Sequence, residues 1–406
     1  MSSAQISRDQ LSASKTALIL AALAMSGCGG GGGSGMAPAS QQSAGSTPMA
    51  ETFTDTPLVT DNKEVVPTST LIDANLQNPW GVAVGPGLPF WIADNNSNVA
   101  TLYSGTGMIE NSGVTGSATV GVAIPASAAG VQANPTGQVY NGHGGFLTPT
   151  PNGPETALFI YDGEGGTIAT WAQDSGATAT TVYDDGIANG TDHAVYKGLA
   201  LASVNGAEFL YATDLHNNKI DVFDTNFTKP AAMQGKFVDP TMPSGFVPFG
   251  ISVVGGQLYV TYAMQDAAKH DEMTGAGRGY VDIFDFSGNF VSRFASAGVL
   301  NAPWGIAVAP AGFGTLQGFV LIGNFGDGTI NVFTTNGSAL ATSVGPLKGA
   351  NGQALSFPGL WSVVFGNGDA DKPATTLFYT AGFASQTDGV FGTITVASTG
   401  TGGGGY

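Results

Sequence analysis

The sequence predicts an all-β protein, a six-bladed β-propeller closed by an N-terminal strand in its last blade. A short motif recurs six times at nearly constant spacing, each copy is followed by further strand patterns, and no segment shows sustained helical periodicity. The 406 residues include 62 glycines and have a hydrophobic fraction of 42%, which suits a large core with many tight turns. Four-stranded units repeated around an axis are typical of a propeller.

The repeated motif marks the first strand of each blade. Each copy contains a small residue. In most copies an aromatic or proline residue comes before it and alternating apolar residues come after it, as in Asn78-Pro79-Trp80-Gly81 and Pro303-Trp304-Gly305. The six small residues, spaced 52 to 61 residues apart, are Gly81, Gly137, Gly198, Gly250, Gly305 and Ser362. A fixed period of this size indicates a repeat architecture.

Further strand patterns follow each copy of the motif. The expected second strands are 90–93, 158–161, 209–212, 258–262, 319–322 and 377–380. The clearest third strands, at 219–223, 280–284 and 329–333, alternate with a period of two and are rich in β-branched and aromatic residues.

The last repeat lacks one strand at its C-terminal end, and the N-terminal segment can supply it. Residues from Ser362 to Val396 suffice for three strands, and those from Pro57 to Gly81 complete one repeat period. We therefore expect the segment 57–71 to provide the outer strand of the last blade. This closure removes the open sheet edge that a linear repeat would leave.

The chain is expected to begin with an export signal and a lipid attachment site. Residues 1–27 carry early positive charges and an apolar stretch, Thr16 to Met25, that is too short to span a bilayer. Cys28, the only cysteine, follows Met25-Ser26-Gly27 in a pattern that resembles a bacterial lipobox, so we expect it to be acylated. An ordinary signal peptide with an incidental cysteine is the alternative. The expected location is the cell envelope, lipid-anchored on its periplasmic or cell-surface side.

Composition divides the rest of the chain into three parts. Residues 28–56 are rich in Gly, Ser, Ala and Thr and are expected to form a flexible tether. Residues 57–397 are expected to form the propeller, and residues 398–406 a glycine-rich tail.

The charge balance argues against polyanionic partners. Twelve Lys and Arg stand against 29 Asp and Glu, for a net charge of −17. Without a basic patch the chain is not expected to bind nucleic acid or to adsorb to anionic lipid headgroups. Any membrane contact is therefore expected through the lipid anchor only.

Several strings resemble those of an uncharacterised family of exported bacterial six-bladed propellers. They include Asn78-Pro79-Trp80-Gly81, Tyr196-Lys197-Gly198-Leu199-Ala200 and Gly323-Asn324-Phe325-Gly326-Asp327-Gly328. This resemblance covers nearly all of 57–397 and implies the fold, without an established activity. More distantly the repeats are similar to NHL-repeat and gluconolactonase-like propellers, of which some are calcium-dependent hydrolases and others binding scaffolds. In the gluconolactonase-like family a metal-binding Glu precedes the first Gly-Pro, whereas Gln77-Asn78-Pro79 carries no carboxylate.

The residues just before the small positions are candidate ligand-binding residues near one rim of the central channel. They are Trp80, Thr136, Lys197, Phe249, Trp304 and Trp361. Three Trp and one Phe around an axis can stack on an apolar or sugar-like ligand. The alternative is that these aromatic residues plug the channel as part of the core.

The loops after the second strands are expected on the same side, called here the crown face. Five of their residues are candidate metal ligands: Asp94, Asp162, Asp214, Asp266 and Asn324. Converging oxygen ligands suit Ca²⁺, which takes six to eight of them. The alternative is local, because Asp and Asn favour such turns by bonding their own backbone. His216 lies in one of these loops and is a further candidate ligand-binding residue.

Two functional hypotheses follow. The leading one is a lipid-anchored extracytoplasmic propeller that binds a small molecule or a protein at the crown end of its channel. The alternative is a calcium-dependent hydrolase or lyase of the lactonase-like kind. The insertion 265–279 holds most of the charges of its blade and is the longest crown loop, so we expect it to act as a lid or partner contact. Catalytic residues are not identified, since the sequence contains neither a Gly-x-Ser-x-Gly nor a His-Glu-x-x-His motif.

Overall fold

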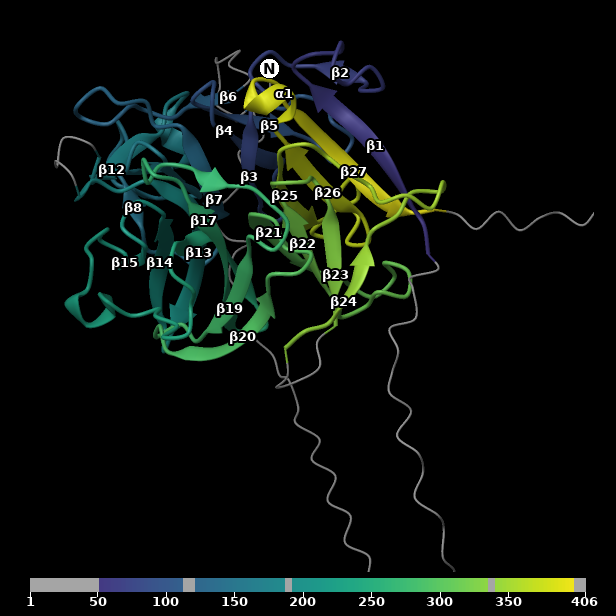
Figure 1. Ribbon diagram of the computed structural model, residues 1–406. Helices are drawn as coiled ribbons and strands as arrows, with labels where there is room; N and C mark the ends of the chain where they lie inside the picture. Colours follow the sequence, from purple (N-terminus) through teal and green to yellow (C-terminus); the bar gives the residue numbers. More distant parts are fainter. Residues whose placement is uncertain (1–50, 112–120, 187–191, 335–339, 398–406) are drawn as a thin grey trace, which may run out of the picture. The chain divides into compact units, whose positions relative to one another are not determined.

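The computed structural model describes residues 51–111, 121–186, 192–334 and 340–397. These residues belong to one compact unit, Ser46–Tyr406. The predicted export signal, the lipid attachment site at Cys28 and the C-terminal tail lie outside the described residues. Six of the seven sheets in the described residues have at least three strands and form the blades, which confirms the six-bladed propeller (Figure 1). No helix in the described part of the chain is long and apolar enough to cross a membrane.

The first strand of each blade forms the inner ring around the axis. These strands are β3 (Pro79–Val84), β7 (Pro135–Tyr140), β13 (Tyr196–Val204), β16 (Phe246–Val254), β21 (Pro303–Val308) and β25 (Leu360–Phe365). Each contacts the next one along the chain, and β25 contacts β3, so the ring is closed. All six start at the repeated motif, as the sequence predicts.

The second and third strands continue each sheet outward. The second strands are β4 (Phe90–Asp94), β10 (Phe159–Gly163), β14 (Ala207–Asp214), β17 (Gln257–Gln265), β22 (Val320–Asn324) and β26 (Leu377–Ala381). The third strands are β5 (Val99–Tyr103), β11 (Thr167–Trp171), β15 (Lys219–Phe223), β19 (Tyr280–Phe284), β23 (Ile330–Phe333) and β27 (Val390–Val396). Because neighbouring strands are antiparallel, the loops after the second strands lie on the side where the inner strands begin. This side is the crown face.

Five blades have a fourth, outer strand in the described part of the chain. These strands are β6 (Gly121–Ala123), β12 (Thr180–Asp184), β20 (Phe290–Ser296), β24 (Ser343–Pro346) and β1 (Phe53–Thr60). β1 pairs with β27 from Phe53 opposite Val396 to Thr60 opposite Val390, which confirms the predicted closure. Figure 1 shows the two strands side by side, purple against yellow.

The closing strand starts four residues before its predicted start at Pro57. The strand extends back to Phe53 because the Phe53 side chain is buried and packs against Phe313, with 5.2 Å between the ring centroids. One aromatic residue among threonines gives only a weak strand pattern. The predicted remainder, 61–70, forms turns, and the short β2 (Leu71–Ile72) then pairs with β1 in parallel.

The third blade has three strands, β13, β14 and β15, where the repeat predicts four. Its missing outer strand falls in the segment 224–245, which holds turns and a 3-10 helix at Ala231–Met233. Pro230, Pro240 and Pro243 interrupt this segment, and proline has no amide hydrogen to donate to a strand ladder. Other short elements are β8 (Leu147–Thr148), β9 (Glu155–Thr156), β18 (Glu272–Met273), the 3-10 helix Gln173–Ser175 and α1 (Phe383–Gln386).

The core lies between adjacent blades and at the axis. Between the first and last blades, for example, Phe90 packs on Phe378 and Phe391 with ring centroids 4.5 and 5.5 Å apart. At the axis the blades approach so closely that a Cβ on Gly137 or Gly250 would lie less than 3.0 Å from backbone atoms of the next inner strand. This close approach explains the recurring small residue.

Candidate functional site

Four of the predicted aromatic residues converge at the crown end of the axis, and we call them the aromatic plug. Trp80 stacks on Trp361 with 3.4 Å between ring centroids, and Trp304 meets Trp80 edge-on at 6.0 Å. The ring centroid of Phe249 lies 6.0 Å from that of Trp361. All four side chains are buried, so the rings cover one another and close the channel.

The channel continues on the other side of the aromatic plug. There a cavity of about 370 Å³ is lined by the parts of the inner strands that follow the plug residues, among them Val82–Val84 and Gln138–Tyr140. The inner strands run away from the crown face, so this cavity lies toward the opposite face. The plug therefore separates it from the crown.

Lys197 is the buried charge at the axis. Its ammonium group lies 5.3 Å from the centre of the Trp80 ring, forms an ion pair with Glu164 and lies 3.3 Å from Asp271 Oδ1. Its backbone carbonyl accepts a hydrogen bond from Trp304 Nε1 at 2.7 Å. Burial alone would lower the pKa of Lys197, but the neighbouring carboxylates outweigh it and hold the pKa above its ordinary value. The side chain therefore stays charged.

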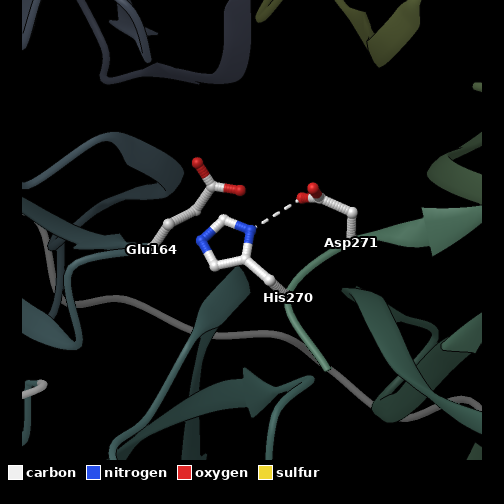
Figure 2. A group of neighbouring side chains, drawn as sticks. All are labelled: Glu164, His270 and Asp271. Atoms are coloured by element: carbon white, nitrogen blue, oxygen red, sulfur yellow. Dashed lines mark hydrogen bonds and ion pairs between the residues drawn. The ribbon is translucent and has the colours of Figure 1, made fainter. Parts of the chain in front are cut away.

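The insertion of the fourth blade supplies Asp271, one of the two partners of Lys197, and the second blade supplies the other, Glu164. Its strand β18 pairs with the end of β17, and the residues just before β18, His270 and Asp271, lie close to Glu164 (Figure 2). His270 Nδ1 lies 2.9 Å from Asp271 Oδ1, and this bond raises the pKa of His270 and lowers that of Asp271. Burial raises the pKa of Glu272 to about 7. The ion pair of Asp271 with Lys197 thus holds the insertion in place, and its expected role as a lid or partner contact stays a prediction.

Two of the predicted metal ligands are used inside their own blades. Asp94 Oδ2 accepts from the amide of Thr101 at 3.1 Å, across the turn that joins its two strands. Asp162 Oδ1 accepts from Thr136 Oγ1 at 2.9 Å and from the amide of Gly137 at 2.6 Å. Burial raises the pKa of Asp162 to about 7 and that of Asp94 well above its ordinary value. Both carboxyls therefore support their blades locally.

Two more candidates lie in equivalent places. Asp214 accepts from the amide of Val195 at 3.2 Å and from Asn217 Nδ2 at 2.7 Å. Asn324 Oδ1 accepts from the amide of Asn301 at 3.1 Å. Each side chain again bonds to its own crown turn or to the neighbouring loop.

The remaining two candidates belong to the insertion and its surroundings. Asp266 Oδ1 accepts from the amide of His270 at 2.9 Å and so shapes the turn of the insertion. His216 Nδ1 lies 3.1 Å from the carbonyl oxygen of Lys269, and its ring lies 4.3 Å from that of His193. His216 therefore contacts the insertion at Lys269.

The donors that do converge fit Ca²⁺ poorly. Within the described ranges, the one group of three possible metal ligands is Glu164, His270 and Asp271, whose ligand atoms lie within 4.8 Å of one another. None of the five predicted metal ligands belongs to it. It contains a nitrogen donor where Ca²⁺ prefers oxygen, and Lys197 already supplies the positive charge that its two carboxylates need. A calcium centre would have to displace the ion pairs that these carboxylates form with the buried ammonium group of Lys197.

A pocket of about 480 Å³ lies on the crown face beside the aromatic plug. Three blades line it, through Thr274, Phe325, Gly326, Asp327, Pro358, Gly359, Gly382, Ser385 and Gln386. Phe325 links it to the plug, because its ring stacks on Trp361 with 4.3 Å between centroids. Thr274 lies on the insertion, where Arg278 Nη1 donates to its carbonyl at 2.8 Å. We call this hollow the crown pocket.

One wall of the crown pocket has a strained backbone. In α1, three consecutive residues, Ala384, Ser385 and Gln386, have φ values of 49°, 60° and 70°. None is glycine, so each costs about 1 kcal/mol or more in this left-handed conformation. Gln386 is held there by Asn78 Nδ2, which donates to its side-chain oxygen at 3.3 Å, and by Asn96 Nδ2, which donates to its carbonyl at 2.6 Å. Strain that surrounding bonds maintain is often found at ligand-binding sites.

Sequence reasoning missed the residues that give this face its shape. Asp271 and Phe325 lie in segments that it noted without assigning either residue to a site, and Glu164 lies two residues after the predicted ligand Asp162. The concentration of charge in the insertion was a signal for Asp271. The left-handed turn at Ser385 and Gln386 has no such signal, because its sequence contains neither glycine nor asparagine.

Comparison with known proteins gives relatives of similar length. The chain is 33% identical over 326 residues to the uncharacterized protein R648 of Acanthamoeba polyphaga mimivirus, covering 79% of this chain and 76% of that protein. It is 31% identical over 330 residues to the uncharacterized protein L690 of the same virus, covering 79% and 81%. No family model matches the chain.

Solved structures with a similar arrangement include two enzymes. The soluble aldose sugar dehydrogenase of Escherichia coli is 13% identical with a TM-score of 0.47, covering 85% of this chain and all of that one, 100%. A streptogramin B lyase is 13% identical with a TM-score of 0.45, covering 85% and 97%.

Proposed function

The chain belongs to the family that includes these two mimivirus proteins, and we propose that it is an exported, lipid-anchored propeller that binds a small polar ligand in the crown pocket. The observation that carries this proposal is the pocket itself. Its volume of about 480 Å³ is in the range of small-molecule sites, and loops of three blades wall it. The pocket is thus formed by several blades together and not by one loop.

Preorganisation of the walls supports the proposal. The ion pair of Lys197 with Asp271 fastens the insertion that carries Thr274, and Asn78 fastens the strained turn at Gln386. A pocket whose walls are already fixed loses little conformational freedom when a ligand binds. We therefore regard Lys197 as a positioning residue for the pocket.

The alternative function, a calcium-dependent hydrolase or lyase, has less support. The predicted acids are bonded within their own blades, and the converging carboxylates of Glu164 and Asp271 are already paired with Lys197.

The binding proposal predicts that one class of small molecule raises the thermal stability of the propeller through the crown pocket. Neutral sugars, nucleosides and amino acids would each be added before thermal unfolding, with Ca²⁺ and excess chelator in parallel. A ligand at 100 times its dissociation constant adds about 2.7 kcal/mol to the free energy of unfolding. The shift should disappear in Thr274→Trp, which fills the pocket from an exposed position, and persist in the control Thr68→Trp, since Thr68 is exposed and does not line the pocket.

Three outcomes would contradict the binding proposal. If no compound shifts the wild type, or if the shift survives Thr274→Trp, the crown pocket is not the binding site. If Ca²⁺ alone shifts the wild type and chelator reverses this, and Asp271→Asn abolishes the shift, the metal-dependent alternative is favoured.

The anchoring proposal rests on Cys28 and predicts a change of cell fraction. Wild-type chain expressed in a bacterium that processes lipoproteins should partition with membranes, and Cys28→Ser should appear in the soluble exported fraction. An acyl-modified cysteine with several chains holds far more firmly than a single chain. If both proteins are soluble after export, the lipid anchor is wrong, while the binding proposal is unaffected.

A further inference from the structure

We infer that the ligand of the crown pocket is a neutral saccharide that stacks on Phe325. This inference rests on the proposed function and specifies its ligand class. The Phe325 ring is half-buried, Trp361 covers one of its faces, and the rest of the ring borders the pocket. An aromatic ring that is held from behind offers a flat apolar surface to the C–H groups of a sugar ring.

The polar lining is suited to hydroxyl groups. Thr274 and Ser385 contribute hydroxyls and Gln386 an amide, which can both donate and accept. Gly326 and Gly382 pack closely against neighbouring asparagine side chains, because a Cβ at either position would collide with Asn301 or Asn78. Neutral polar side chains beside one aromatic ring match a ligand with many hydroxyls and no charge.

The charges of the lining argue against ionic ligands. No Lys, Arg or His is among the described residues that line the pocket, so an anion would find no counter-charge. Asp327 is its one acid, and both carboxylate oxygens are already used: Oδ1 accepts from Thr329 Oγ1 at 2.6 Å, and Oδ2 from Asn301 Nδ2 at 3.1 Å. A cationic ligand would have to compete with these donors.

The test measures sugar affinity in the wild type and four variants by isothermal titration calorimetry, with glucose, arabinose, maltose and cellobiose as probes. Phe325→Leu keeps apolar volume but removes the ring, and should weaken binding about tenfold or more; Phe325→Tyr keeps the ring and should bind within about threefold of wild type. Asp327→Asn should also bind within about threefold, because a neutral ligand does not need the charge. Phe286→Leu, at a half-buried aromatic outside the pocket, controls for general loss of stability.

The outcomes separate the two proposals. If nucleosides or amino acids bind in a manner that Thr274→Trp abolishes, and no saccharide does, the ligand class is wrong but the binding function stands. If saccharides bind equally well to Phe325→Leu, the stacking assignment is overturned. If nothing binds to the wild type, both proposals fail together.

Discussion

Deleting Phe53–Thr60 is expected to abolish the cooperative unfolding of the propeller and to yield aggregated or partly unfolded protein. β1 is the outer strand of the last blade, and it places the buried side chains of Phe53, Leu58 and Val59 against that sheet and its neighbours. Without it, the ladder groups of β27 are unpaired and form an open edge, which favours aggregation. Circular dichroism on heating, together with size-exclusion chromatography, would measure both effects.

A single substitution in β1 gives a measurable result even if the deletion variant does not fold. Phe53→Ala should cost about 3–5 kcal/mol, since it empties a fully packed site beside Phe313. Total stabilities are only about 5–15 kcal/mol, so this single change should lower the melting temperature clearly. Thr54→Ala, exposed on the same strand, is the matched control and should change stability by less than about 0.5 kcal/mol. A deletion variant that melts at the wild-type temperature would refute closure by β1.

Gly137→Ala and Gly250→Ala are each expected to lower the free energy of unfolding of the propeller by about 1–3 kcal/mol. A Cβ at Gly137 would meet the backbone nitrogen of Leu199, and one at Gly250 the backbone oxygen of Trp304. Neither glycine has a positive φ, so the expected cost is steric. Backbone in the neighbouring inner strand cannot move aside as a flexible side chain can, and the inner ring would have to widen.

The last blade provides the matched control for these variants. Ser362 occupies the equivalent place, already has a Cβ and is buried. Ser362→Ala should therefore change the midpoint of denaturant unfolding much less than either glycine variant does. Equal effects at all three positions would show that the recurring small residue is not required by the close approach of the blades.

The fold could be predicted from the sequence because its physical causes are local and repeat. Alternating apolar residues mark the strands, and the small residue recurs wherever two inner strands approach closely, so six copies locate six blades. The third blade departs from the repeat for an equally local reason, since Pro230, Pro240 and Pro243 fall where its outer strand should form.

The candidate site was less predictable because it depends on where side chains point. Trp80, Trp304 and Trp361 were expected at the axis, but whether they face a ligand or one another is decided by packing, and they pack together. Asp162 was expected to face the axis, yet a carboxylate at a strand end finds backbone donors at once, here the amide of Gly137. The recurrence of aspartate in each blade reflects a recurring turn more than a shared centre.

Ring closure by the first strand also determines when this protein can finish folding. Thr60 Oγ1 donates to the carbonyl of Gly389, 329 residues away, at 2.7 Å. Chains grow from the N-terminus at roughly 5–20 residues per second, so the first strand waits on the order of tens of seconds before its partner exists. During synthesis the early blades can pair locally while the seam stays open. Completion of the ring is therefore a late, long-range step, and until it occurs the nascent protein exposes a strand that needs protection from other chains.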